Sequence, residues 1–510
     1  MSASNKERDE RSPEVRDQRS SEVRDQRSPK ERDQRSPAAR WKFLATPAGR
    51  LAMVAAYTAL LAVSNAAAWP AVALGLVVTS LLPQHRRVIL AIATIGVIAF
   101  SPPLDIDRLG ALASWHFASS WMPLWPFAVI ATLAFGCGYV ELIRRKPKSL
   151  FARRPVLILV LLLTALLVVA GDLPINGGAW FVVTSLSMCL ASYLWFFAYA
   201  ASETKLRGAP PATRQLGYWR PFWGFSNVPI GKGAAYLERV EARDAETLAR
   251  VQLRGLQLMA WCTLLFFVMN AFRFAVYAPH GPIGGVAGRL LWWLPPEGLP
   301  PIPALLEYQA RGEPLPFATR WASMLAEFVM TVLHMTTWGN SIVATCRMAG
   351  YDAAPNTDRP LLSTSIAEFY NRFYFYFKEL LATFFFYPTY LGFFRSQPKV
   401  RLFVATVMAA GFGNFLFHFF RDSDRIYSLG FFPALFAYRT YALYALILGV
   451  GIAISQVRLL ARHRRHPQGL RRAGATVGVL FFYCLLGLLD VQTPYDLSDY
   501  AAVYLSLFVP

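Results

Sequence analysis

The chain has 510 residues, of which 55% are hydrophobic and only 16% charged, and its mean hydropathy is +0.34. A soluble protein of this size is not expected to be so apolar, so the composition excludes the soluble classes and indicates a membrane protein. The net charge of +20 does not indicate a nucleic-acid partner, because most of it falls in short loops between long apolar runs.

Residues 1–40 form a charged tail unlike the rest of the chain. They contain eleven Lys or Arg and nine Asp or Glu residues, a net charge of +2, and they repeat an octad that begins with Arg-Asp. The tail has almost no apolar side chains to offset its ordering entropy, so we expect it to be disordered, as a solvated extension rather than a binding segment. Residues 41–510 are expected to form a single membrane-embedded domain.

Long apolar runs follow one another through the remainder of the chain. Backbone groups in lipid must be hydrogen-bonded internally, and these runs do not alternate in polarity, so the predicted fold is all-α and polytopic. With shorter or in-plane pieces at 373–394 and 500–509, we expect about eleven to thirteen transmembrane or re-entrant helices. The clear spanning runs are 51–82, 88–100, 123–140, 156–170, 180–201, 256–275, 321–346, 402–420, 431–455 and 475–489.

The basic residues of the loops predict the orientation of the chain. By the positive-inside rule the clusters around 85–87, 395–401 and 458–472 are cytoplasmic, as is the N-terminus. The two apolar runs after 401 then form a hairpin whose turn, 421–430, lies outside, and the loop 171–178 is outside too. Because 347–359 and 395–401 are both placed inside, the run 373–394 between them is expected to be re-entrant or to lie in the cytoplasmic interface.

Two longer loops are predicted. The cytoplasmic loop 203–254 is polar and basic, with an amphipathic helix expected over 234–253 and an aromatic stretch, 218–225, suited to the membrane interface. The outer loop 278–320 is rich in Pro and Gly. It could dock a partner, although an irregular linker at the membrane surface is the preferred interpretation.

No sequence pattern indicates a bound metal or cofactor. The five cysteines stand singly in apolar segments without metal-ligand or redox spacing, so we interpret them as packing residues. Glycine pairs such as Gly284-Gly285 lack the strand–turn–helix context of a dinucleotide site.

The run 411–420 places one histidine, His418, inside an apolar stretch of membrane length. An ionisable side chain at that depth is costly to insert, so it is a functional candidate by default. Asn414 and Asp422 lie four residues to either side on the same helix face, and Gly411 would allow a neighbouring helix or a substrate to approach closely. An imidazole between an amide and a carboxylate can hold one tautomer and accept a proton. The alternative is a buried histidine that merely bonds a neighbouring helix.

The segment 356–374, NTDRPLLSTSIAEFYNRFY, resembles the first motif of the membrane-bound O-acyltransferase superfamily. The similarity is greatest to its bacterial branch, the alginate O-acetyltransferases and D-alanyl-transfer proteins. The second motif of the family, a histidine at a helix end, falls where Gly413 to His418 stands. The positions that match the first motif without a gap are Asn356, Pro360, Ser365-Ile366, Glu368-Phe369, Arg372 and Tyr387-Pro388.

The chain also departs from the pattern of that branch. Tyr374 stands where the branch usually has a histidine, and Ala382-Thr383 stands where the acetyltransferases have an Arg-Asp pair. Phe417 and Phe419 flank the second-motif histidine in place of Trp and Gly. A divergent substrate and an inactive relative would both fit these departures.

The resemblance implies transfer of an acyl group, expected to be acetyl, from a cytoplasmic thioester to a hydroxyl of an envelope acceptor such as a polysaccharide. Such a transfer needs a base near the acceptor oxygen and stabilisation of the oxyanion. We predict His418 as the base. Asn371 could donate to the acyl carbonyl, and Tyr374 could supply a hydroxyl in place of the missing imidazole. The structural alternatives are an interhelical amide for Asn371 and packing for Tyr374.

The expected donor is acyl-CoA or an acyl carrier protein, and four cations around the predicted re-entrant stretch could bind phosphate groups of the donor. Ordinary positive-inside anchoring is the favoured alternative for them. Glu327 and His334, two turns apart on one helix face, could line the same cavity or form a buried structural bond. The four cations are Arg372, Lys378, Arg395 and Lys399.

The resemblance also implies partners. The bacterial branch often hands its acyl group to a second, extracytoplasmic protein, so we expect such a partner or a polysaccharide-synthesis complex at the cytoplasmic membrane of a bacterium. Two non-catalytic alternatives stay open. One is a transporter-like subunit in which Glu327, His334 and His418 are pathway residues. The other is a scaffold that docks its complex through the loop 278–320.

Overall fold

The computed structural model describes residues 42–64, 69–100, 125–174, 177–204, 211–223, 226–277, 298–313, 315–461, 468–491 and 495–509. These residues form helices and connecting loops, with one isolated β-bridge between Glu241 and Tyr351. The predicted all-α class is therefore confirmed. The predicted disordered tail and residues 278–297 of the predicted outer loop lie outside the described residues.

Among the described residues, seven helices are long and apolar enough to cross a membrane, and we call them candidate spans. A bent pair, α4 (Trp69–Leu81) with the first half of α5 (Arg86–Phe100), turns by 112° and would make an eighth. The protein is thus a polytopic, all-helical membrane protein. The candidate spans are α8 (Trp125–Arg145), α10 (Pro155–Asp172), α11 (Gly177–Glu203), α14 (Ala245–Tyr277), the continuous run Pro398–Arg421, α25 (Arg439–Ala461) and α26 (Gly469–Asp490).

The other predicted segments are shorter or more polar. The apolar helix α3 (Pro47–Val63) has 17 residues, and α17 (Phe317–Met348) carries charged and histidine side chains along its 32 residues. Proline at the first turn and polar caps begin many helices, as in α3, where the Thr46 hydroxyl accepts from the Gly49 N–H at 3.1 Å. The short helices are α9 (Leu150–Arg153), α12 (Ala212–Gln215), α13 (Ala234–Val240), α16 (Ile302–Ala310), α18 (Ile366–Phe373), α19 (Phe375–Leu381), α20 (Tyr387–Gly392), α21 (Pro398–Thr406), α22 (Asn414–Arg421), α23 (Asp424–Leu429), α24 (Phe431–Ala437) and α27 (Leu497–Ser506).

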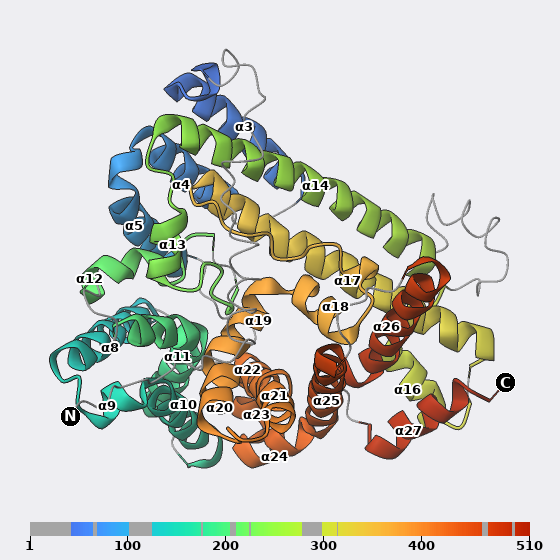
Figure 1. Cartoon of the computed structure of the whole chain (residues 1–510). Helices are drawn as coiled ribbons and strands as arrows, with labels where there is room; N and C mark the ends of the chain where they lie inside the picture. Colours follow the sequence, from blue (N-terminus) through green and yellow to red (C-terminus); the bar gives the residue numbers. More distant parts are fainter. Residues whose placement is uncertain are drawn as a thin grey trace, which may run out of the picture.

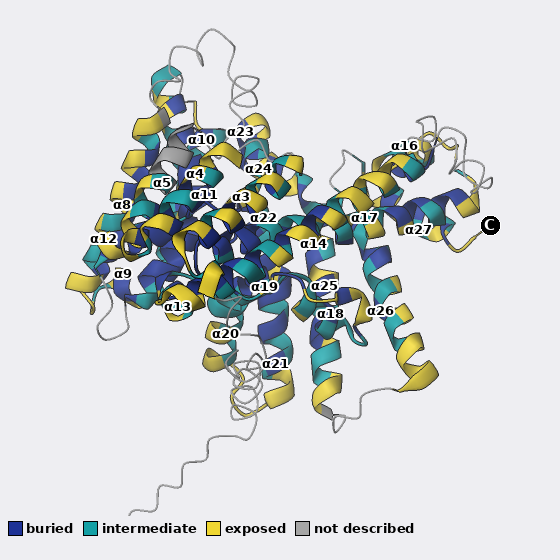
Figure 2. Cartoon of the chain, turned by 90° about the horizontal axis from the view of Figure 1, so that it is seen from above, coloured by how far each residue is buried: buried dark blue, intermediate teal, exposed yellow. Residues whose placement is uncertain are grey.

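Helix α11 lies at the centre of one half of the molecule. In its apolar window 83% of the residues are buried, against 22% in α14, so α11 is surrounded by protein while α14 leaves much of its surface for lipid. Helices α8 and α10 pack on α11, and α22 reaches it from the other side. Figure 2 shows the buried residues gathered around α11 and α22, with exposed residues at the free ends of α20, α21, α25 and α26.

Helices α14 and α17 form a long antiparallel pair that crosses the molecule (Figure 1). The two helices approach closely at Gly255, where the absence of a side chain leaves room. A Cβ added there would lie 2.9 Å from the carbonyl oxygen of Ala344. At the other end of the pair, the Tyr277 hydroxyl donates to Glu327 at 3.0 Å. These contacts join residues about 50 to 90 positions apart in sequence along one helix pair.

The motif region forms a helical hairpin. Helix α19 continues through a π-helical segment, Ala382–Phe386, into α20, and this arm packs along the whole run Pro398–Arg421. The rings of Phe377 and Phe417 lie 4.8 Å apart near one end, and Arg401 stacks on Tyr390 at 3.8 Å near the other. Two placements were predicted for 373–394, re-entrant or in the cytoplasmic interface, and an arm that runs lengthwise beside a candidate span fits the re-entrant one.

The predicted single helix over 234–253 is wrong, because the chain breaks between α13 and α14. Glu241 leaves the helix to pair with Tyr351, and the Asp244 carboxylate caps α14 by accepting from the Thr247 N–H at 2.8 Å. The aromatic stretch predicted at 218–225 faces the protein over the part that the structure describes. Four of its aromatic side chains are buried in the protein core, namely Tyr218, Trp219, Phe222 and Trp223.

Candidate functional site

His418 lies on α22 in an aromatic setting contributed by three helices. Its imidazole is 5.7 Å from the Phe377 ring of α19, 5.4 Å from the Phe417 ring and 4.9 Å from the Tyr441 ring of α25, centre to centre. The side chain is partly exposed, yet its Nδ1 is buried and has no hydrogen-bond partner among the described residues. Buried polar atoms are nearly always satisfied, so this unpaired nitrogen requires an explanation.

The two polar residues predicted to flank the histidine form their hydrogen bonds with other groups. The side-chain oxygen of Asn414 accepts from the Tyr441 hydroxyl at 3.3 Å. The Asp422 carboxylate is held by Arg421, at 2.6 and 2.9 Å, and by the Tyr438 hydroxyl at 2.9 Å. The expected direct contacts with the imidazole are therefore not formed, and His418 is positioned by aromatic packing.

A π-helical segment, Val407–Gly413, immediately precedes Asn414 and brings the site close to α25. The predicted close approach at Gly411 is confirmed, since a Cβ on Gly449 of α25 would lie 2.8 Å from the Gly411 nitrogen. On the other side, a Cβ on Gly413 would lie 2.6 Å from the Phe385 ring. Single π-helical turns occur often at functional sites, and here the turn sets the direction in which α22 presents its side chains.

The first-motif segment forms and holds the turn that leads into α19. Asn356 is fully buried, and its carbonyl accepts from the Phe375 N–H at 2.8 Å. Asn340 of α17 holds the same turn, because its side-chain oxygen accepts from the Asn356 N–H at 2.9 Å. Ser365 caps α18 by accepting from the Glu368 N–H at 3.1 Å. These residues therefore position α19 beside His418 without contacting the histidine themselves.

The two other predicted catalytic residues differ in their placement. Tyr374 lies in the bend between α18 and α19, and its hydroxyl interacts with Ser226 and with the charge of Arg421. Burial raises the pKa of Tyr374 to about 12, so the phenol stays protonated near neutral pH and can serve as a hydrogen-bond donor. Asn371 is exposed on α18, and the structure does not bring it to the histidine.

The four cations predicted to bind the donor do not form one cluster. Arg372 is paired with a glutamate one turn earlier on α18, at 2.8 Å, and Lys378 is paired with Glu379 at 2.9 Å. Arg395, in the turn between α20 and α21, and Lys399, in the first turn of α21, are exposed at the far end of the hairpin. These residues are near one another in sequence, but the length of the helical arm that carries Lys378 and Arg395 separates its two ends.

Glu327 and His334 also lie apart from the site. Glu327 accepts from the Tyr277 hydroxyl at 3.0 Å in a partly buried bond within the α14–α17 pair. His334 is exposed on α17. The sequence interpretation also missed Tyr441, the residue that links Asn414 and His418. Tyr438, Tyr441 and Tyr444 recur every third position on one helix face, and that spacing was the available signal.

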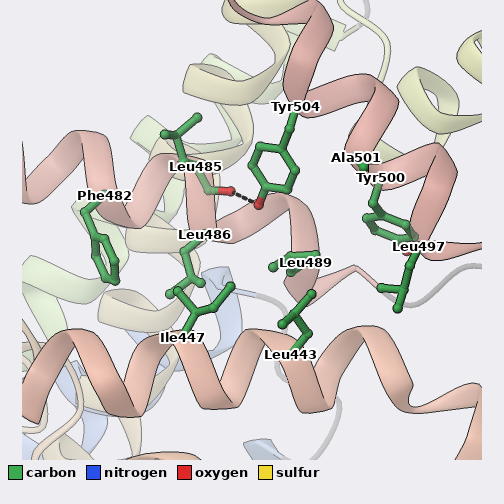
Figure 3. Close-up of a pocket in the computed structure, with 10 residues that line it drawn as sticks. All are labelled: Leu443, Ile447, Phe482, Leu485, Leu486, Leu489, Leu497, Tyr500, Ala501 and Tyr504. Atoms are coloured by element: carbon green, nitrogen blue, oxygen red, sulfur yellow. Dashed lines mark hydrogen bonds between the residues drawn. The ribbon is translucent and has the colours of Figure 1, made fainter.

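A separate apolar hollow of about 410 Å³ opens between α25, α26 and α27 (Figure 3). Its lining is aliphatic and aromatic, and the Tyr504 hydroxyl donates to the Leu485 carbonyl at 2.7 Å. There is no carboxylate or imidazole among its lining residues. We therefore assign no proton transfer to it.

These observations define a class: a polytopic, all-helical membrane protein with a histidine held among aromatic rings where a helical hairpin meets α25. No family model matches the chain. No curated protein sequence matches it significantly. The function is therefore inferred from the residues of the site.

Proposed function

We propose that the protein is a membrane-bound O-acyltransferase. In this proposal it moves an acyl group, expected to be acetyl, from a thioester donor to a hydroxyl of an envelope acceptor such as a polysaccharide. His418 acts as the general base. The observation that supports this most strongly is the meeting of the two motif segments, because the Phe377 ring, three residues after the first motif, lies 5.7 Å from the His418 imidazole.

The chemistry requires one group that takes a proton and then returns it. As the acceptor hydroxyl attacks the thioester carbonyl, the imidazole of His418 removes the hydroxyl proton and a C–O bond forms. The C–S bond then breaks, and the departing thiolate takes the proton from the imidazolium. Among the described residues, no group forms a hydrogen bond with Nδ1 of the ring. Tyr374 is the protonated donor proposed to stabilise the oxyanion.

The arrangement of the loops supports a transfer across the membrane. The loops predicted to lie outside are neighbours, since the Phe431 N–H donates to the Asp172 carboxylate at 2.8 Å. The loops predicted to lie inside are also neighbours, because Arg254 pairs with Asp352 at 3.0 Å. We propose that the donor enters from the cytoplasm of a bacterium and that the acceptor, or a partner protein that carries the acyl group onward, is reached from outside.

The test is a comparison of ester groups on the envelope. Base-releasable acyl groups on polymers and lipids are measured by mass in cells that carry the intact gene, His418→Ala or His334→Ala. His334 is the matched control, since it is a histidine that lies exposed on α17 and has no role in the proposed reaction. We expect one ester species to be lost only in His418→Ala, at equal membrane levels of the three proteins. An unchanged ester profile in His418→Ala would reject the proposal and favour a transporter or scaffold.

A further inference from the structure

A polar hollow of about 630 Å³ lies far along the chain from the histidine, at the start of α3, the beginning of α5 and the loop between α13 and α14. These elements are neighbours in the fold (Figure 1). Two of its lining side chains are arginines that are almost completely buried: Arg50 is 7% exposed and Arg86 is 1% exposed. Arginine is rarely buried to this extent unless an anion compensates its charge.

The buried guanidinium groups are only partly satisfied by the protein. One terminal nitrogen of Arg86 donates to Glu241 and to the Ala242 carbonyl, both at 3.2 Å. Nε and the other terminal nitrogen of Arg86, together with Nε of Arg50, are buried and have no hydrogen-bond partner among the described residues. Each unpaired donor costs free energy in the folded protein. The protein therefore leaves buried arginine donors beside the hollow without acceptors, although the Arg86 guanidinium also lies 5.5 Å from the centre of the Tyr351 ring.

The excess of positive charge in the hollow also favours an anionic ligand. Its lining includes four arginines and only two carboxylates, Glu241 and Asp244. Glu241 is already shared, because it pairs with Arg86 at 3.2 Å and with Arg87 at 3.4 Å. Arg50 and Arg86 line the same hollow, so their positive charges repel each other. A bound anion would remove this repulsion, whereas a neutral ligand would not.

We propose that this hollow is a binding site for a phosphate group. A tetrahedral phosphate offers several acceptor oxygens to the planar donor forks of two arginines, and this geometry favours phosphate over a single point anion. The volume exceeds that of one phosphate ion, so the site can also hold the groups to which the phosphate is esterified. The inference is independent of the acyl transfer proposed for His418.

The surroundings favour a phospholipid headgroup as the source of this phosphate. Val88 lines the hollow and is 59% exposed, and Leu82, next to the lining residue Pro83, is 45% exposed. Large apolar side chains at the rim of a basic hollow suit a place where a headgroup enters and its acyl chains stay outside. A soluble phosphate compound such as coenzyme A is the other source of the same chemistry.

The test uses the full chain purified in neutral detergent. Retention of phosphatidylglycerol is measured by native mass spectrometry, and thermal stability is measured with added phosphatidylglycerol, phosphatidylcholine, inorganic phosphate or coenzyme A. The variants are Arg50→Gln and Arg243→Gln, the second being an exposed lining residue whose loss should not affect folding. Arg145→Gln is the control, since Arg145 is a surface arginine paired with Glu141 elsewhere.

We expect wild type and Arg145→Gln to bind a phosphate ligand and each site variant to bind it about tenfold more weakly, as for loss of a charge-assisted hydrogen bond. Stabilisation by phosphatidylglycerol alone would identify a lipid headgroup as the source. Stabilisation by coenzyme A or inorganic phosphate would identify a soluble ligand. If no phosphate compound binds, or if Arg243→Gln and Arg50→Gln bind as well as wild type, the proposal is overturned.

Discussion

The ring of Tyr441 lies 4.9 Å from the imidazole of His418, and the hydroxyl of the same tyrosine donates to the side chain of Asn414. Tyr441 belongs to α25, whereas the other two residues lie one turn apart on α22. The tyrosine therefore fixes the distance between the two helices at the site. It does so through ring packing, and the buried Nδ1 of the imidazole has no hydrogen-bond partner among the described residues.

Removal of the Tyr441 hydroxyl is predicted to impair acyl transfer moderately. Tyr441→Phe keeps the ring contact but leaves Asn414, which is 2% exposed, without its partner. A net hydrogen bond of this kind is worth about 1 kcal/mol, so the initial rate of ester formation should fall about threefold to tenfold. The rate is measured in membranes with matched amounts of protein.

Tyr438→Phe is the matched control, because the Tyr438 hydroxyl bonds Asp422 and not the Asn414 side chain. Its rate should stay closer to wild type than that of Tyr441→Phe. Equal rates for wild type and Tyr441→Phe would mean that the hydroxyl has no part in positioning the site.

Sequence periodicity predicted the local features well, because they depend on residues near one another in the chain. The apolar runs became helices, and Gly411 forms the close helix contact that its position in an apolar run suggested. The partners of His418 could not be found in this way. Tyr441 is 23 positions downstream, and its contact with the imidazole depends on how α22 and α25 pack.

The partners of the charged residues could not be predicted from the sequence for the same reason, since they too depend on how the helices pack. Lys378 and Arg395 are 17 positions apart, yet the hairpin places them toward opposite ends of one arm. Glu379 is bound by Lys378 and also by Lys232, from a loop that sequence proximity could not connect to it. Hydrophobic pattern gives the helices, whereas the pairing of charges depends on tertiary contacts that a single sequence does not display.

Gly449→Ala is predicted to destabilise the fold around the site. The new methyl group would lie 2.8 Å from the backbone nitrogen of Gly411, and backbone cannot move aside as the end of a flexible side chain can. We expect a loss of about 1–3 kcal/mol, typical of overpacking, and a lower midpoint of thermal unfolding in detergent.

Gly478→Ala is the matched control for this change. Gly478 lies on α26 with nothing within 4 Å of its added Cβ, so alanine should be neutral or raise the midpoint through its higher helix propensity. If Gly449→Ala were as stable as Gly478→Ala, the close contact of α25 with the π-helical segment would not exist as described.

The cap of α14 provides a pH-dependent test of the fold. The Asp244 carboxylate accepts from the Thr247 N–H at 2.8 Å and from the Thr247 hydroxyl at 2.7 Å. These hydrogen bonds lower the pKa of Asp244, because they favour the charged form. A group whose pKa is lowered on folding contributes stability above its unfolded pKa and loses that contribution as the pH falls through its folded pKa.

Asp244→Ala should therefore lower the free energy of unfolding by about 1 kcal/mol near neutral pH, as loss of an N-cap does. The difference in unfolding midpoint between wild type and Asp244→Ala should be constant from neutral pH to about pH 5 and should shrink below about pH 4, where aspartate becomes protonated. Asp244→Asn keeps a capping oxygen that does not titrate, so its difference from Asp244→Ala should not change with pH. A wild-type difference that persisted undiminished at pH 3 would show that the charge of Asp244 does not support the cap.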